Sequence, residues 1–374
     1  MGNQVLGSLS VKTFLQHYWQ KKAHLFQQTL PDFLGFLTAK EIKQLATHQD
    51  VQSRLVIRQG KNYVLHHGPF RLIDLKGLGD KNWTLLIQSL NHWLPEADNL
   101  LHDFRFIPYA RLDDIMVSYA TPGGGVGPHY DHYDVFLLQG YGIRRWQIAK
   151  TDDLSIRPNQ SLKLLQRFKA QQTWDLEAGD MLYLPPKWAH HGVAQTECFT
   201  YSIGFRAPTY QEWVNAMLDY LRDEFQIEGN YSDPKLTEQR HPAKLPEELI
   251  DQVYAITQKI KWGRKDIADM VGRYLSEPKP HVFFDPEYQP ISLQQFTQYW
   301  SKQELKLDAK AQILFHQSHF FINGERLTPP INCFPLLTKL ADHKILSPME
   351  KSKQPKELAL LLYEWYTQGW LHLG

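Results

Sequence analysis

Between residues 114 and 206 the sequence becomes a succession of short strand-like segments, and this stretch constrains the fold more than any other feature. The segments are four to six residues long and combine β-branched, aromatic and aliphatic side chains. They lie at 115–120, 135–139, 144–148, 181–184 and 200–205. Glycine and proline occur at most of the junctions, as turns between strands require. Many short strands at this spacing predict a small β-barrel or jelly roll.

The flanking regions have a different periodicity. Residues 10–91 and the region after Pro208 show apolar residues mainly at helical spacing. Helices are expected at 82–93, 210–221, 246–260, 266–275 and 355–365, and strands at 51–57, 63–66, 311–315 and 320–322. The prolines within 277–280 indicate a linker. We therefore expect an α+β protein with three domains, at 1–207, 208–278 and 279–374.

Overall composition narrows the function classes only slightly. The 374 residues include 41 basic and 40 acidic side chains, so that only a local basic patch could indicate nucleic-acid binding. Two cysteines, Cys198 and Cys333, cannot form a disulfide framework and fit a reducing compartment. The sequence shows neither an apolar run long enough for a membrane span nor a signal peptide at its start. A cytoplasmic location is expected.

A possible metal site lies within the strand-rich region. His129 and Asp131 are two residues apart, so in an extended chain their side chains point the same way. The glycines at 123–125 allow close backbone approach before them, and His190 follows a later turn. Two histidines and one carboxylate form the facial triad of non-haem Fe(II) oxygenases. The alternative is that His129 and Asp131 bond to each other while His190 caps a turn. His190 is preferred over the adjacent His191, which would point outward or support the metal-binding residues from behind.

The pair Arg144-Arg145 is the second constellation. An oxygenase of this type needs a buried cation to bind the distal carboxylate of a dicarboxylate co-substrate, and arginine offers a bidentate, permanently charged fork. Because neighbours in a strand face opposite sides, at most one of the two points inward. The alternative is that both are solvated charges of a hairpin.

These residues belong to longer motifs that resemble a known family. The motifs are 122–136, with Pro122-Gly-Gly-Gly and His129-Tyr-Asp131, then 139–146, 179–186 with His190, and 201–208. They resemble the JmjC-type ribosomal oxygenases, above all the bacterial ribosomal protein L-sixteen arginine 3-hydroxylases. The resemblance spans nearly the whole chain and is weaker after Pro278. One departure is the turn Lys187-Trp188-Ala189, where a glycine-led turn is expected.

The resemblance implies an architecture and a chemistry. The architecture is a double-stranded β-helix of the jelly-roll, cupin or JmjC type, followed by a helical dimerisation domain and a C-terminal winged-helix domain. His129, Asp131 and His190 would bind Fe(II), and Arg144 would bind 2-oxoglutarate, which is consumed together with O2. The substrate would be an arginine side chain of a large-subunit ribosomal protein.

An arginine substrate would favour carboxylates or aromatic faces near the mouth of the barrel. Asp113, Asp114, Tyr119, Asp134 and Tyr141 are the candidates. Two alternatives remain open at this point. One is the same chemistry on a histidyl, asparaginyl or methyl-lysyl residue; the other is a non-catalytic cupin-like binding protein.

The expected partners are the ribosomal substrate and a second copy of the chain. The resemblance implies a homodimer through the segment after Pro208. Nucleic-acid binding by the C-terminal part is not expected, because its charges nearly balance. In that part of the sequence, the acidic residues Glu304 and Asp308 nearly balance the basic residues Lys302, Lys306 and Lys310.

Overall fold

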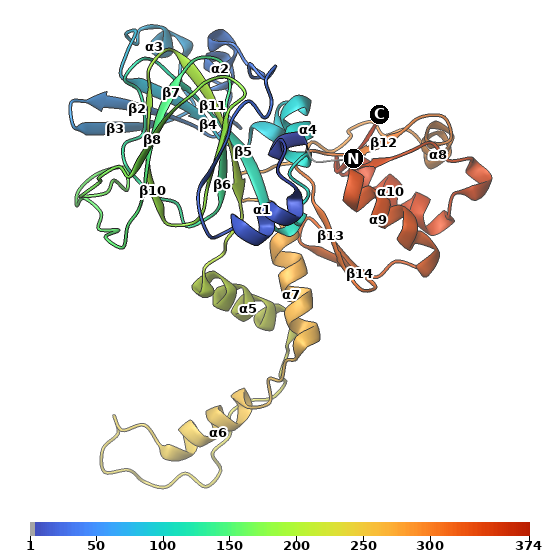
Figure 1. The fold of residues 1–374 in the computed structure, drawn as a ribbon. Coiled ribbons are helices and arrows are strands. Elements are labelled where there is room, and N and C mark those ends of the chain that lie inside the picture. Colours follow the sequence, from blue (N-terminus) through green and yellow to red (C-terminus); the bar gives the residue numbers. More distant parts are fainter. Residues whose placement is uncertain (1–3) are drawn as a thin grey trace. The chain divides into compact units, whose positions relative to one another are not determined.

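The computed structural model describes residues 4–374, and their contacts divide the chain into two compact units (Figure 1). The first unit runs to Ala207 and also contains Pro280–Phe284; the second consists of Pro208–Lys279 and Asp285–Gly374. The division into three domains, with a separate helical domain at 208–278, stays a prediction. Among residues 4–374, no helix combines the length and the apolar character needed to cross a bilayer.

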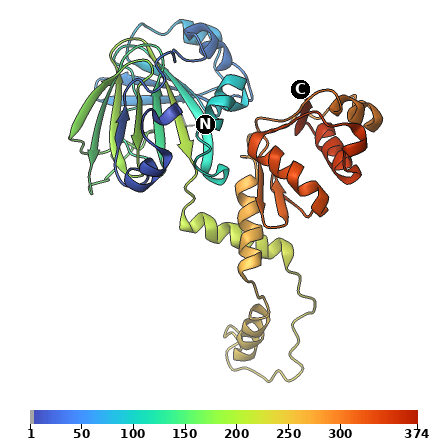
Figure 2. The same ribbon diagram turned by 45° about the vertical axis from the view of Figure 1, so that its right-hand side comes forward.

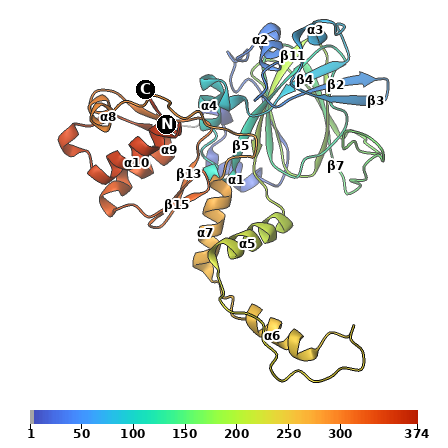
Figure 3. The same cartoon turned by 180° about the vertical axis from the view of Figure 1, so that it is seen from behind.

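Two antiparallel sheets form the body of the first unit, and Figures 1 and 3 show them from opposite sides. The large sheet has the strand order β1-β9-β6-β11-β5-β4-β2-β3, and the small sheet has the order β10-β7-β8. The strands are β1 (His24–Phe26), β2 (Ser53–Gln59), β3 (Asn62–His67), β4 (Trp83–Ile87), β5 (Leu112–Ala120), β6 (Val135–Gln139), β7 (Arg144–Lys150), β8 (Gln172–Leu176), β9 (Met181–Leu184), β10 (Trp188–Ala194) and β11 (Cys198–Phe205). Val135 and Leu137 of β6 and Leu182 of β9 pack against Trp146 and Ile148 of β7, so the sheets lie face to face. This arrangement confirms the jelly roll.

The two faces of the large sheet have different partners, as β5 illustrates. Ile115 and Val117 belong to the core that the sheet shares with the N-terminal helices, where Phe14 is fully buried. These helices are α1 (Val11–His17), α2 (Ala39–Leu45), α3 (Leu72–Lys76) and α4 (Pro95–His102). Asp114 and Ser118 point the other way and line a cavity. One face of the sheet therefore stabilises the unit, and the other carries the candidate site.

The helix expected at 82–93 is wrong. Trp83–Ile87 is strand β4, which lies between β2 and β5 and is buried at all five positions. A strand buried on both faces is apolar without strict alternation, and over a few residues its pattern cannot be distinguished from a helical one. Ser89, with φ of 53°, follows the strand and precedes the short 3-10 helix Leu90–His92. Strand β8 was also missed, because only Leu176 in it is buried.

The second unit contains six helices and two small sheets among its described residues. The helices are α5 (Tyr210–Glu224), α6 (Glu247–Thr257), α7 (Arg264–Ser276), α8 (Leu293–Trp300), α9 (Phe334–His343) and α10 (Lys356–Thr367). The sheets are β13 (Ile313–His316), β14 (His319–Ile322) and β15 (Glu325–Leu327), and β16 (Ile345–Leu346), β12 (Leu305–Leu307) and β17 (Leu371–Leu373). Further single-turn 3-10 helices are Gln4–Leu6 and Tyr109–Arg111 in the first unit and Ile331–Cys333 and Lys351–Lys353 in the second.

Helices α5 and α7 are joined through a buried carboxylate. Tyr220 of α5 and Arg326 of β15 donate hydrogen bonds to Asp269 of α7, at 3.3 and 3.1 Å. Helix α6, by contrast, follows a long connection at residues 225–246 (Figure 2), and none of its residues is buried. The end of the unit has its own core around Trp300 and Trp365, both at most 2% exposed.

Candidate metal centre

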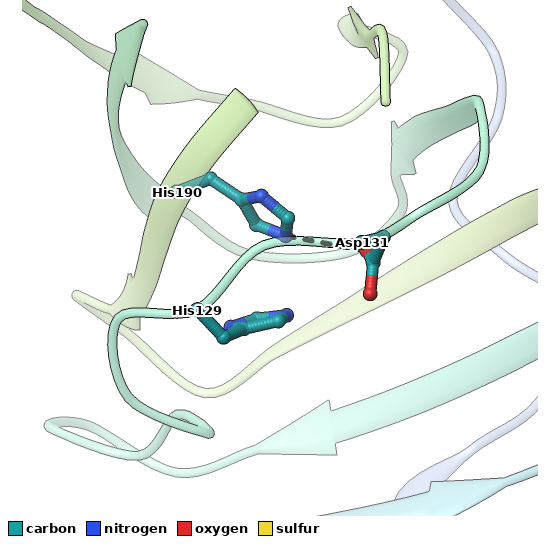
Figure 4. A group of neighbouring side chains, drawn as sticks. All are labelled: His129, Asp131 and His190. Carbon is teal, nitrogen blue, oxygen red and sulfur yellow. Dashed lines mark ion pairs between the residues drawn. The ribbon is translucent and has the colours of Figure 1, made fainter. Parts of the chain in front are cut away.

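A pair of backbone hydrogen bonds brings the two histidines together. The His129 amide donates to the His190 carbonyl at 3.0 Å, and the His190 amide donates to the His129 carbonyl at 2.8 Å. Asp131 follows two residues later on the same side, with its Oδ2 at 3.6 Å from Nε2 of His190. One ligand atom from each of the three side chains lies within 4.8 Å of the other two (Figure 4). Residues 61 positions apart in the sequence thus converge on one point.

Backbone carbonyls orient both imidazole rings. Nδ1 of His129 lies 2.9 Å from the Gly127 carbonyl, and Nδ1 of His190 lies 2.9 Å from the Trp188 carbonyl. Because a carbonyl only accepts, each Nδ1 carries the proton and each Nε2 presents a lone pair to the centre. Burial lowers the pKa of His190 to about 4, which keeps the ring neutral and able to bind a metal. Two neutral imidazoles and a carboxylate, without a thiolate, suit Fe(II).

Close contacts between backbone segments restrict which residues fit at positions 125 and 187, near the two histidines. A Cβ on Gly125 would lie 2.3 Å from the Gly192 carbonyl oxygen of β10, so a larger residue would separate the two segments. Lys187, at the turn into β10, donates its amide to the Asp131 carbonyl at 2.7 Å. Its φ of 64° lies in the left-handed region, where glycine is the least strained residue. The unusual lysine therefore occupies the backbone conformation of a glycine-led turn.

The buried cation is Arg144. Only 4% of it is exposed, and its Nη1 donates to Ser118 Oγ at 2.8 Å and to Thr200 Oγ1 at 3.0 Å. Within residues 4–374 no carboxylate forms an ion pair with it, and its buried Nε has no hydrogen-bond partner. Arg145 points to the other side and pairs with Asp175 at 2.7 Å. A buried guanidinium with an unused donor suits an anionic ligand, such as the carboxylate of 2-oxoglutarate.

The metal-binding triad and Arg144 line one cavity of about 420 Å³ in the first unit. Its walls are the inner faces of both sheets, and the connection between β7 and β8 contributes Leu162 and Leu164. The buried Trp146 Nε1 and Thr84 Oγ1 have no hydrogen-bond partner among the described residues. The cavity thus combines apolar side chains with several polar ones, which suits a small polar ligand.

The candidate substrate residues fall into two groups. Asp113 and Asp114 line the cavity. Asp134, Tyr119 and Tyr141 do not line it. The carboxylate of Asp134 accepts from Tyr183 Oη at 2.6 Å and from Gln20 at 2.9 Å, in the core shared with α1.

Tyr119 and Tyr141 lie away from the metal for different reasons. The Tyr119 hydroxyl donates to Glu197, and the side chain packs in the core of the large sheet. Tyr141 is 56% exposed, on the turn between β6 and β7. His191 is not among the side chains that meet at the metal position, and its Nε2 lies 3.5 Å from the Tyr63 hydroxyl.

Several residues of the cavity were not expected from the sequence. They are Arg54, Gln88, Met116, Tyr133 and Ser202. They lie on or directly beside β2, β4, β5, β11 and β6, and the pairing of these strands brings them together. The alternation within each strand could have indicated the face, but not which strands are neighbours.

Two family models match the chain, a JmjC domain at residues 99–213 and a ROXA-like winged helix at residues 249–372. The ribosomal protein uL16 3-hydroxylase of Escherichia coli is 35% identical over 76% of each chain. A probable ribosomal oxygenase of Haemophilus influenzae is 40% identical over 56% of this chain and 52% of its own length. The ribosomal oxygenase YcfD of E. coli, solved with cobalt and 2-oxoglutarate, has a TM-score of 0.82, 29% identity and 98% coverage of both chains. With a matching fold from end to end and a His-Asp-His cluster inside the JmjC domain, the chain belongs to the JmjC-type ribosomal oxygenases, in the family of the uL16 3-hydroxylase.

Proposed function

We propose that this protein is an Fe(II)- and 2-oxoglutarate-dependent dioxygenase that hydroxylates an arginine side chain of a uL16-type ribosomal protein. One observation carries the proposal. The triad of His129, Asp131 and His190 shares a single cavity with the buried Arg144, which has no ion-pair partner in the described chain. Iron held by this triad supplies, with 2-oxoglutarate and O2, an oxidation that yields succinate and CO2 and inserts one oxygen atom into a substrate C–H bond.

The residues around the triad bind and orient the reactants. The Arg144 fork, held by Ser118 and Thr200, pairs with the distal carboxylate of 2-oxoglutarate. Trp146 and the surrounding aliphatic walls exclude water, which strengthens these electrostatic contacts. Nothing among these side chains has to gain or lose a proton for the co-substrate to bind.

An arginine substrate fits the polar end of the cavity. Asp113 and Asp114 place two carboxylates there, and the ring of Tyr133 lines the same end. A guanidinium can donate two parallel hydrogen bonds to one carboxylate and can lie over an aromatic face. We therefore keep Asp114 as the substrate-binding residue and leave Tyr119, Asp134 and Tyr141 out of the proposed site.

The test measures product and target together. Iron-loaded protein is incubated with 2-oxoglutarate and a uL16 peptide, and succinate and peptide mass are followed. We expect stoichiometric succinate and a mass gain of about 16 Da on arginine, since a single oxygen atom is added. Asp131→Ala should abolish both products. A mass gain on a histidine, asparagine or methyl-lysine would replace the substrate, and absence of both iron binding and succinate would leave a non-catalytic cupin.

We further propose a homodimer formed through α5 and α6. These helices expose large apolar side chains, with Leu218 60% and Tyr254 65% accessible. Val214 on α5 and Val253 on α6 are about half exposed, at 51% and 49%. Several large apolar side chains exposed on one segment are typical of protein interfaces. The cytoplasm, where ribosomal proteins are made, is the location that suits this substrate.

A further inference from the structure

Gln88 lies between a cation and a carboxylate in the cavity. It follows strand β4, while Arg54 is on β2 and Asp114 on β5, the two neighbours of β4 in the sheet. Nη2 of Arg54 donates to Gln88 Oε1 at 3.3 Å, and Gln88 Nε2 donates to the Asp114 carboxylate at 2.9 and 3.1 Å. All three side chains line the cavity. A single amide group thus separates Arg54 from Asp114.

The two charged neighbours fix the orientation of this amide. A guanidinium only donates hydrogen bonds and a carboxylate only accepts them. Turning the Gln88 amide over would place its NH2 group against Arg54 and its oxygen against Asp114, which loses both contacts. Gln88 therefore has one stable orientation.

Removing Gln88 would favour a movement of the Arg54 side chain toward Asp114. It is half-buried, its other polar contact is the sulfur of Met116 at 3.4 Å, and it forms no ion pair within residues 4–374. A direct guanidinium–carboxylate pair is stronger than a hydrogen bond to a neutral amide. Since the Gln88 amide contacts both groups, removing it leaves a gap of one amide group, which a long, flexible arginine side chain can span.

Asp114 does not depend on Gln88 for its position. The Ser89 amide and hydroxyl donate to Asp114 Oδ2 at 3.1 and 2.7 Å. The left-handed backbone of Ser89 directs both donors to the same oxygen. Since Ser89 already anchors the carboxylate, the contribution of Gln88 lies in what it keeps away.

We propose that Gln88 is a specificity-determining spacer, which prevents the guanidinium of Arg54 from occupying the place of the substrate guanidinium on Asp114. This inference rests on the proposed function, in which Asp114 binds the target arginine. Gln88 itself is a positioning residue: it touches neither the metal-binding side chains nor Arg144. Without Gln88, the guanidinium of Arg54 would compete with the substrate guanidinium for Asp114.

The test is a double-mutant cycle in the full, iron-loaded chain. The variants are Gln88→Ala, Arg54→Met and their combination, and KM and kcat are measured for a uL16 peptide with the target arginine. Gln88→Ala should raise the peptide KM roughly ten- to a hundredfold, the loss expected when a charged hydrogen-bonding site is blocked. The KM for 2-oxoglutarate, whose site is on Arg144, should stay unchanged. In the double variant the peptide KM should return to that of Arg54→Met.

Arg58→Met is the matched control. Arg58 is another half-buried arginine of β2, but it donates to the carbonyls of Gly60 and Gly123 at 3.1 and 3.3 Å. Combined with Gln88→Ala it should give no recovery. If Gln88→Ala leaves the peptide KM unchanged, or if Arg54→Met fails to restore it, the spacer role is refuted. Should Gln88→Ala not fold, Gln88→Ser, which is also too short to separate Arg54 from Asp114, carries the same cycle.

A crystal structure of Gln88→Ala separates this proposal from the proposed function. We expect an Arg54 nitrogen within hydrogen-bonding distance of Asp114. If the wild-type protein hydroxylates no arginine, the proposed substrate is wrong, yet the position of Arg54 in the variant still decides whether Gln88 holds the two groups apart. An Arg54 that remains in its wild-type position overturns the inference.

Discussion

Replacing Arg144 by methionine should stabilise the protein without ligand and abolish its stabilisation by 2-oxoglutarate. Arg144 is a buried charge without an ion pair in the described residues, and burial lowers the pKa of its guanidinium. Exchanging such a charge for an apolar side chain of similar volume gains about 1–3 kcal/mol. The hydroxyls it leaves keep partners, because Thr200 donates to Gln139 at 2.9 Å and Ser118 reaches the Thr200 carbonyl at 3.5 Å.

The assay is thermal unfolding with zinc in place of iron, with and without 2-oxoglutarate. Each kcal/mol shifts the midpoint by roughly 2–4 °C in a protein unit of this size. The wild type should gain about 2.7 kcal/mol at a ligand concentration one hundred times Kd, and Arg144→Met should gain nothing. The variant should therefore be more stable than wild type without ligand and less stable, or equal, with it. A lower midpoint for ligand-free Arg144→Met would show that the guanidinium already has a compensating partner, and the reasoning would fail.

Four further predictions follow from single contacts. Asp131→Ala should lose metal binding by calorimetry while keeping its fold by circular dichroism, because a carboxylate is removed from a three-residue site. Lys187→Gly should leave the free energy of unfolding equal or raise it by up to about 1 kcal/mol, since φ there is 64°, whereas Lys187→Val should lower it in the same denaturant titration. The 2.7 Å pair of His372 with Asp308 raises the pKa of the histidine above 6.5 and lowers that of the carboxyl below 3.8. Its contribution should thus be present between these values, fall as pH rises through the folded histidine pKa, and vanish in His372→Gln when unfolding midpoints are compared across pH. Leu218→Glu should convert the proposed dimer to a monomer in light scattering, because it places a charge on an exposed apolar face.

The metal-binding cluster could be predicted from the sequence because its spacing is itself geometric. His129 and Asp131 share a face in any extended segment, and the nearby glycines announce a close backbone approach. The structure adds what spacing cannot express, namely that β10 returns beside this segment and places His190 opposite His129. The sequence left open which of the neighbours Arg144 and Arg145 points into the site. This choice is decided by the register of β7, whose residues alternate between buried and exposed at this end.

The substrate end could not be predicted in the same way. Tyr119 and Asp134 have side chains that could bind a guanidinium, and both lie near the metal-binding motif in the sequence. However, both face the core between the large sheet and the N-terminal helices. A candidate list based on residue type alone contains no information on which side of a strand meets the cavity. That information comes from the alternation of side chains along a strand, once it is known which way one side chain of that strand points. In β5, Ser118 contacts Arg144, so that Met116 and Asp114, two and four positions before it, must share its face.

The same argument explains why Gln88 was not predicted as a cavity residue and why residues 82–93 were predicted as a helix. Thr84 and Leu86 of β4 and Gln88, directly after the strand, are two positions apart from one another and all line the cavity. Two polar residues four positions apart also share a face in a helix, which is why the segment could be read with either period. A strand becomes the better prediction once Gln88 is required to have polar partners, because the strand brings Gln88 between Arg54 and Asp114. A polar residue at the end of an otherwise apolar run is thus a signal for the cavity face, provided that the partners on the neighbouring strands are sought together with it.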